Sequence, residues 1–127
     1  MFDRLYNGAK ANATEVGCWA HARRKFHVLA DSDTRVAYPL KLISQLYRLE
    51  DLADRRGLDA EAREPLRTDR SSPILERLDR WLQRTVMNEP PTSALAKACA
   101  YGLKQWVALT EFLGDGLLKL DNNCCER

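Results

Sequence analysis

Three segments of this chain carry apolar residues at three- and four-residue steps, the spacing that places side chains on one face of an α-helix. They span residues 39–56, 73–86 and 93–113. The stripes are Leu40, Ile43, Leu46, Tyr47, Leu49 and Leu52; Ile74, Leu75, Leu78, Trp81, Leu82 and Val86; and Leu95, Cys99, Leu103, Trp106, Val107 and Leu113. Because such stripes are stable only when buried, we expect the helices to pack together around Leu46, Leu78, Trp81 and Trp106.

Residues that begin and end helices flank these stripes. Gly57 follows the first stripe, at the position of a glycine C-cap. Ser72 and Pro73 precede the second stripe, and we expect them to be the N-cap and the first helical residue. A further charged helix is expected over residues 59–69, interrupted or kinked at Pro65.

Residues 14–21, TEVGCWAH, are the one good candidate for a β-strand, because apolar and other residues alternate along VGCWAH. A lone strand leaves its backbone hydrogen bonds unsatisfied and must join a sheet. We expect its partners to come from the first dozen residues or from another part of a larger protein. The chain is therefore predicted to be mainly α.

The composition indicates an ordinary globular chain. It has 127 residues, 45% hydrophobic and 30% charged, which suits a single domain. No apolar run approaches the roughly 18 residues that a membrane-spanning helix needs. The opening MFDRLYNGAK lacks the pattern of a secretory signal, so we expect a cytoplasmic protein with no membrane partner.

The cysteines allow two candidate sites, neither with a supporting signature. Four cysteines are irregularly spaced, at Cys18, Cys99, Cys124 and Cys125, and we expect reduced thiols. Cys18 and His21 with the final cysteine pair could supply four zinc ligands, but adjacent cysteines chelate poorly. A Cys–His catalytic pair could join Cys124 or Cys125 to His21 or His27. A buried thiol and a hydrogen-bonded histidine are the simpler interpretation.

A compact basic cluster, Arg23, Arg24 and Lys25, stands out although the net charge is only +2. It lies beside Trp19 and Phe26. The cluster is either a solvated helix face or a set of contacts to nucleic-acid phosphates, and its charge alone does not separate these alternatives.

Several stretches occur in an order typical of one family. They are GCWAHARRKF at 17–26, RSSPILERLDRWL at 70–82, ALAKACAYGLKQWVALTEFLGDGLLKLDNN at 94–123 and DNNCCER at 121–127. The series resembles the bacterial transposases of the insertion sequence sixty-six family, over residues 1–127. The resemblance implies a mainly α chain comprising a helical insertion and one or two strands of an incomplete ribonuclease-H-like (α/β) Asp-Asp-Glu catalytic domain.

The same resemblance divides the chain. Residues 14–21 would be the last core strand, about 35–110 the helical insertion, and 119–127 the start of the segment that bears the catalytic glutamate. In such enzymes three carboxylates hold two magnesium or manganese ions, which activate the attacking oxygen and stabilise the leaving one. Glu126 corresponds to the third carboxylate, and Asp121 is expected to cap the helix that carries it.

The remaining expected site residues are candidate DNA contacts. The resemblance implies that Asn122 and Asn123 contact DNA or support the site. Arg127 is expected to contact DNA as well, and so is the cluster of Arg23, Arg24 and Lys25 if it is not a solvated helix face. The two catalytic aspartates of the family lie upstream of the segment that resembles residues 1–10. We therefore expect this chain alone to hold no metal and to lack catalysis.

Two interpretations follow. The chain is a fragment of a transposase whose intact relatives cleave and join DNA at insertion-sequence ends. The alternative is a non-enzymatic helical module that binds DNA or a partner and regulates a full-length transposase. Whether the gene is a decayed remnant or encodes a separate functional chain is left open by the sequence.

Overall fold

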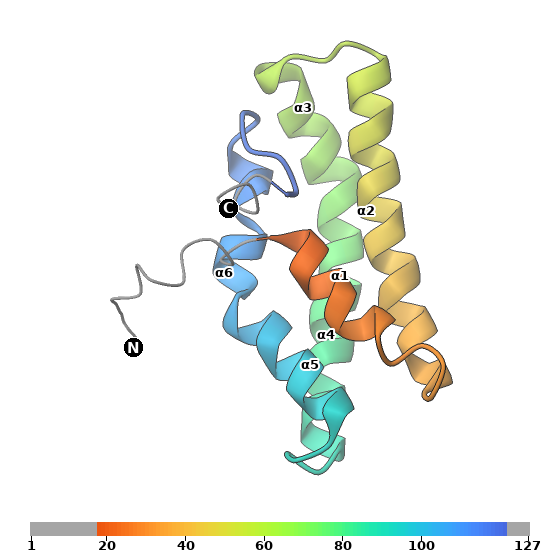
Figure 1. Cartoon of the computed structure of the whole chain (residues 1–127). Coiled ribbons are helices and arrows are strands. Elements are labelled where there is room, and N and C mark those ends of the chain that lie inside the picture. Colours follow the sequence, from red (N-terminus) through yellow and green to blue (C-terminus); the bar gives the residue numbers. More distant parts are fainter. Residues whose placement is uncertain (1–17, 122–127) are drawn as a thin grey trace.

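The computed structural model describes residues 18–121, which are helical and contain no strand (Figure 1). The prediction of a mainly α chain is confirmed for this part. The elements are α1 (Trp19–His27), η2 (Thr34–Val36), α2 (Ala37–Arg55), α3 (Ala60–Leu66), η3 (Arg67–Ser71), α4 (Ser72–Asn88), α5 (Ala94–Lys104), α6 (Trp106–Leu109) and η4 (Glu111–Gly114). Over the same residues, no helix has both the length and the apolar character that crossing a membrane requires.

The strand predicted for residues 14–21 is wrong from Trp19 onward, because α1 begins there. Trp19, Ala22 and Phe26 recur at three- and four-residue steps, and all three are buried. Burying this helical face outweighs the weak alternation that favoured a strand. Residues 14–17 lie outside the described residues, so the predicted sheet is not confirmed.

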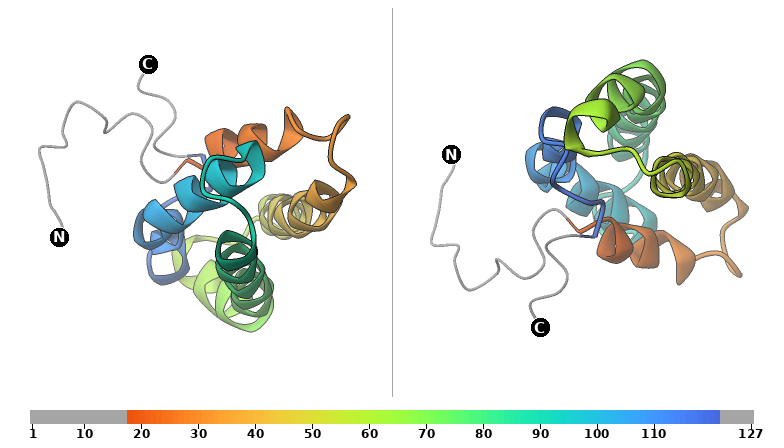
Figure 2. Two further views of the ribbon diagram at one scale, coloured as in Figure 1. Left: turned by 90° about the horizontal axis from the view of Figure 1, so that it is seen from below. Right: turned by 90° about the horizontal axis from the view of Figure 1, so that it is seen from above.

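Four helices form a ring of contacts around one core. Helix α4 lies between α2 and α5, and α1 packs against α2 and α5 on the other side (Figure 2). The predicted core is confirmed, since Leu46 and Leu78 are buried while Trp81 and Trp106 are partly buried against it. Helix α2 runs alongside the continuous α3–α4 rod in the opposite direction (Figure 1).

The helix boundaries confirm one predicted cap and correct another. Gly57 has a φ of 67°, the left-handed conformation that ends a helix at glycine. Ser72 makes no N-cap, because the chain is already helical from Ala60 onward. The N-cap of this rod is Asp59, whose carboxylate accepts from the Ala62 N–H at 2.9 Å.

Pro73 changes the backbone conformation of the α3–α4 rod. The five residues of η3, just before α4, form a π-helical turn. Pro73 lacks an N–H, and its ring would clash with the carbonyl four residues earlier, at Asp69. Widening the backbone to a π turn at this place relieves that clash without ending the helix.

The third predicted helix, residues 93–113, is wrong as a single element. Ser93 is the N-cap of α5, and its hydroxyl accepts from the Ala96 N–H at 3.0 Å. The chain then breaks after Lys104 and again after Leu109. These bends bury Leu109 and Phe112 and leave Val107, a predicted stripe residue, 77% exposed.

Arg67 joins the rod to the segment that follows α6. Its side chain is 0% exposed. The guanidinium donates to both carboxylate oxygens of Glu50, at 2.9 and 2.7 Å. It also donates to the carbonyls of Phe112 (2.7 Å), Asp115 (3.0 Å) and Leu118 (2.8 Å). All five N–H donors of a guanidinium are thereby satisfied, which makes the buried charge tolerable.

The same segment also approaches α3 at Gly116. A Cβ at this position would lie 1.9 Å from the carbonyl oxygen of Ala60. Only glycine permits so close an approach of the two backbones.

We predict that Arg67→Ala lowers the free energy of unfolding by about 3–5 kcal/mol, because Glu50 loses its main partner in a buried setting. Urea denaturation followed by circular dichroism measures this change. The exposed Arg70 on the same rod provides the control, since Arg70→Ala should alter the free energy of unfolding by no more than about 0.5 kcal/mol. A loss below about 1 kcal/mol for Arg67→Ala would show that the ion pair contributes no more than a surface pair.

Candidate functional site

The first and last described segments of the chain meet at the start of α1. The backbone N–H of Trp19 donates to the carbonyl of Leu120 at 3.2 Å. The buried indole Nε1 of the same residue donates to the carbonyl of Leu109 at 2.8 Å. The described helical unit therefore begins and ends at one place.

Asp121 completes this junction. Its Oδ1 accepts from the backbone N–H of Ala20 at 2.9 Å and from the hydroxyl of Tyr47 at 2.6 Å. Ala20 lies in the first turn of α1, where N–H groups have no partner within the helix. A carboxylate is also favoured there by the helix dipole. Asp121 is thus the first-turn acceptor of α1, whereas the helix that it is expected to cap lies outside the described residues.

Tyr47 places a neutral donor beside this carboxylate. Burial raises the pKa of the Tyr47 phenol, and its hydrogen bond to Asp121 raises that pKa further, because ionisation would set two negative charges side by side. The Arg23 guanidinium, 5.6 Å from the ring centre of Tyr47, acts in the opposite direction but more weakly. The phenol therefore remains a donor at neutral pH.

The basic cluster is solvent-exposed on α1, as a DNA contact requires, but it does not form one compact patch. Successive residues of a helix are separated by about 100° around its axis. Arg23 accordingly lies over Tyr47 of α2, whereas the Lys25 ammonium lies 4.6 Å from the ring centre of Tyr101 of α5. Contact between this cluster and DNA stays a prediction.

The other predicted site residues lie outside the described residues. They are Glu126, Asn122, Asn123 and Arg127. Between residues 18 and 121 no three His, Cys, Asp or Glu side chains come together in a way that could hold a metal ion. The described residues therefore contain no group of ligands that could form a metal site together with the carboxylate expected at Glu126.

The expectation of reduced thiols is wrong for Cys18, which is disulfide-bonded. Cys99 is a free, buried thiol. Burial raises the pKa of Cys99 to about 12, so it carries no thiolate at neutral pH and is a core residue rather than a nucleophile.

Sequence reasoning missed three features of the molecule. Arg67 was indistinguishable from the exposed charges of residues 59–69, and the pairing of Tyr47 with Asp121 has no local signal. The third feature is a set of arginines on α4, at Arg77, Arg80 and Arg84, which share the three- and four-residue spacing of the apolar stripe. That spacing alone could have indicated a basic helix face.

Comparison with known proteins yields one family. The family model described as "Transposase IS66 family" matches residues 2–127. The uncharacterized protein y4qI of Sinorhizobium fredii is 36% identical over 126 residues, which are 98% of this chain and 23% of the relative. The uncharacterized protein y4jD of the same organism is 36% identical over 112 residues, 87% of this chain and 22% of that protein.

The chain therefore spans less than a quarter of the length of these curated relatives. No solved structure matches it.

We predict that Tyr47→Phe lowers the free energy of unfolding by about 1 kcal/mol at neutral pH, because Asp121 loses a hydrogen-bond donor. The pKa of Tyr47 in the folded chain lies above the ordinary value of 10.0. The parent chain should therefore lose stability as the pH rises above that value, by up to about 1.4 kcal/mol per pH unit, whereas the variant has no phenol to ionise.

Urea denaturation at neutral pH and at about pH 11 tests this expectation. The stability advantage of the parent over the variant should vanish or reverse at the higher pH, because the loss of about 1.4 kcal/mol exceeds the initial difference of about 1 kcal/mol. Tyr38→Phe is the control, because Tyr38 is 40% exposed and its loss should change little at either pH. A difference that is the same at both values would contradict the assigned role of the Tyr47 hydroxyl.

Proposed function

The chain belongs to the IS66 family of transposases, and we propose that it forms the helical part of a catalytic unit that cleaves and joins DNA strands at insertion-sequence ends. The observation that carries this proposal is the junction at α1. Trp19, at the start of the helical unit, is hydrogen-bonded to Leu120, immediately before the motif of residues 121–127 that contains Glu126.

Such a junction is what an inserted helical unit needs. A unit whose two ends meet can be placed between neighbouring elements of a larger domain without pulling them apart. The described helices also share a core of their own. The unit whose ends meet, from Trp19 to Leu120, contains the insertion that we assign to about 35–110, and residues 119–127 are assigned to the start of the glutamate-bearing segment.

The role of the unit is then to position that segment. Asp121 is tied to α1 and α2 through Ala20 and Tyr47. We propose that these bonds set the point from which the segment bearing Glu126 starts. Asn122, Asn123 and Arg127 are proposed to contact DNA close to the carboxylate.

The oxygen ligand that Glu126 offers is of the kind that magnesium and manganese prefer. Such ions, bound in an assembled catalytic unit, would supply the charge that activates the attacking oxygen and stabilises the leaving one. Of the three catalytic carboxylates of the family, the resemblance assigns one to these 127 residues, and that one is Glu126. We infer that the chain alone does not cleave DNA.

A second candidate function is a non-enzymatic module that binds DNA or a full-length transposase and regulates it. The observation that favours it is the shared core of the described helices, which indicates a unit able to fold without a ribonuclease-H-like sheet.

We predict that the 127-residue chain binds duplex DNA weakly, with little dependence on sequence and a steep loss of affinity as salt rises, because its contacts are to phosphates. Replacing Arg23, Arg24 and Lys25 together by Ala should weaken binding at least about tenfold at low salt. Fluorescence anisotropy with a labelled duplex measures both effects. Unchanged binding would identify the cluster as a solvated helix face.

We also predict that the purified chain does not nick or join DNA with magnesium or manganese, and that Glu126→Gln changes nothing in such an assay. The same replacement at the matching glutamate of a full-length relative should abolish strand cleavage, because a two-metal site loses one of its anchoring carboxylates. A plasmid-nicking assay on both proteins tests the pair of expectations. Metal-dependent nicking by the 127-residue chain, lost on Glu126→Gln, would overturn the inference that it is inactive alone.

A further inference from the structure

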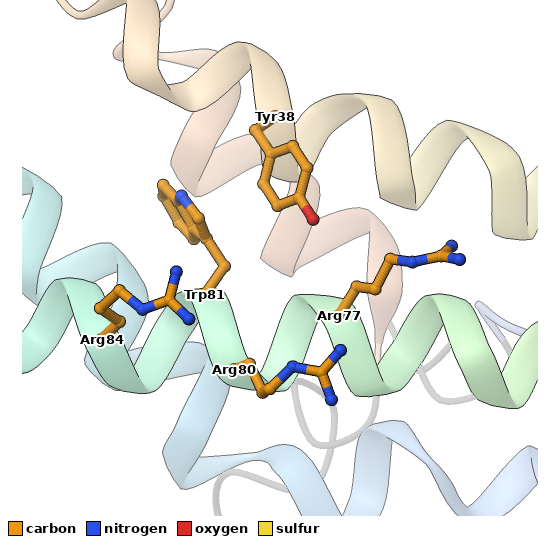
Figure 3. Close-up of a pocket in the computed structure, with 5 residues that line it drawn as sticks. All are labelled: Tyr38, Arg77, Arg80, Trp81 and Arg84. Carbon is orange, nitrogen blue, oxygen red and sulfur yellow. The ribbon is translucent and has the colours of Figure 1, made fainter.

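A cavity of about 200 Å³ opens on the surface where α4 passes the start of α2. It is lined by Tyr38, Arg77, Arg80, Trp81 and Arg84 (Figure 3). Three of the five residues are arginines from one helix, and the other two carry aromatic rings. This site is on a different helix from the basic cluster of α1, and nothing in the family resemblance assigns it a role.

The three arginines carry charge that their surroundings do not neutralise. Among the described residues, Arg35, Arg55, Arg63 and Arg67 each form an ion pair with a carboxylate. Within the same part of the chain, Arg77, Arg80 and Arg84 form none, and all three are exposed. Their N–H donors are therefore available to a ligand.

The acidic residues of α4 line a different cavity from the arginines. Glu76 and Asp79 line a separate cavity together with Trp106 of α6. Asp79 is also engaged by the side-chain amide of Gln83, at 2.9 Å. The arginines of α4 thus line one cavity and its carboxylates another, although Glu76 precedes Arg80 by four residues and so lies beside it on the helix surface.

The spacing of the arginines suits a chain of phosphates. Arg77, Arg80 and Arg84 follow one another along the helix axis at steps of about 4.5 and 6 Å, and together they span roughly 10 Å. One strand of a duplex advances about 3.4 Å per phosphate along its axis, so this span covers about three phosphates. Guanidinium groups bind phosphate oxygens through two parallel hydrogen bonds.

The aromatic residues give the cavity a fixed wall and a further donor. The Trp81 ring packs edge-on against Phe26 of α1, with ring centres 6.1 Å apart, and lies 6.2 Å from the ring of Tyr38. Tyr38 is 40% exposed, and in Figure 3 its hydroxyl is directed away from Trp81, on the side of Arg77. A tyrosine hydroxyl is a common donor to phosphate oxygens.

We propose that Arg77, Arg80, Arg84 and Tyr38, here termed the α4 arginine groove, bind the phosphodiester backbone of DNA as a second contact beside the α1 cluster. The choice of DNA as the ligand rests on the proposed function. The groove itself rests on the unneutralised arginines, their spacing and the aromatic wall.

The test compares three charge-matched variants of the 127-residue chain. The groove variant is Arg77→Gln with Arg80→Gln and Arg84→Gln, which keeps good helix formers on α4. The control is Arg48→Gln with Arg55→Gln and Arg70→Gln, which removes the same charge from the surface of a different cavity. The third is the α1 variant with Arg23, Arg24 and Lys25 replaced by Ala. Circular dichroism establishes that each variant is folded, and anisotropy with a labelled duplex gives affinity as a function of salt.

The groove variant should bind at least about tenfold more weakly at low salt. The magnitude of the negative slope of log K against log salt should decrease by about 2–3, because each arginine makes one phosphate contact. The control should change the slope by less than about 1. Replacing the three arginines by Lys should restore the slope but leave affinity several-fold below the parent. Tyr38→Phe should weaken binding about two- to tenfold.

The outcomes distinguish a failure of the groove proposal from a failure of the proposed function. If the α1 variant loses binding while the groove variant binds like the parent, the groove proposal fails and the proposed function stands. Equal losses in the groove variant and the control also overturn the groove, because binding would then follow net charge alone. Displacement of DNA by poly-glutamate at matched charge would do the same. If the parent chain fails to bind DNA at low salt, the proposed function itself fails.

Discussion

The buried guanidinium of Arg67 is the interaction on which the rest of the structure depends. A buried charge lowers the stability of the fold unless it is paired and fully hydrogen-bonded. Arg67 meets that condition by binding Glu50 of α2 and the carbonyls of Phe112, Asp115 and Leu118. Helix α2, the α3–α4 rod and the segment after α6 are thereby joined at one side chain. No apolar residue at this position could hold three backbone carbonyls in place.

This anchoring extends to the junction at α1. Leu118, held by Arg67, lies two residues before Leu120, which accepts the backbone N–H of Trp19. The next residue, Asp121, then reaches the first turn of α1 and the hydroxyl of Tyr47. The place at which the chain leads into its final motif is thus determined by the packing of the whole helical unit. On the proposed function, this unit gives the segment that bears Glu126 a defined starting point.

The basic residues of α1 and α4 are distributed differently around their helices. The chain has a net charge of only +2, so neither basic surface follows from the overall composition. On α1, consecutive basic residues diverge around the helix, and two of them rest on tyrosine rings. On α4, arginines at three- and four-residue steps line one cavity. Spacing along a helix, rather than the number of charges, decides which basic residues can act together.

The sequence by itself determined the elements whose causes are local. Apolar periodicity predicts α2 and α4 and places Leu46 and Leu78 in the core, and the residues beside Gly57 show that it ends α2. Tertiary structure alone decided that the third stripe is broken, that Arg67 is buried and that Asp121 meets Ala20, 101 residues away. These outcomes depend on contacts between residues far apart in the chain, and such contacts leave no periodic trace around either partner.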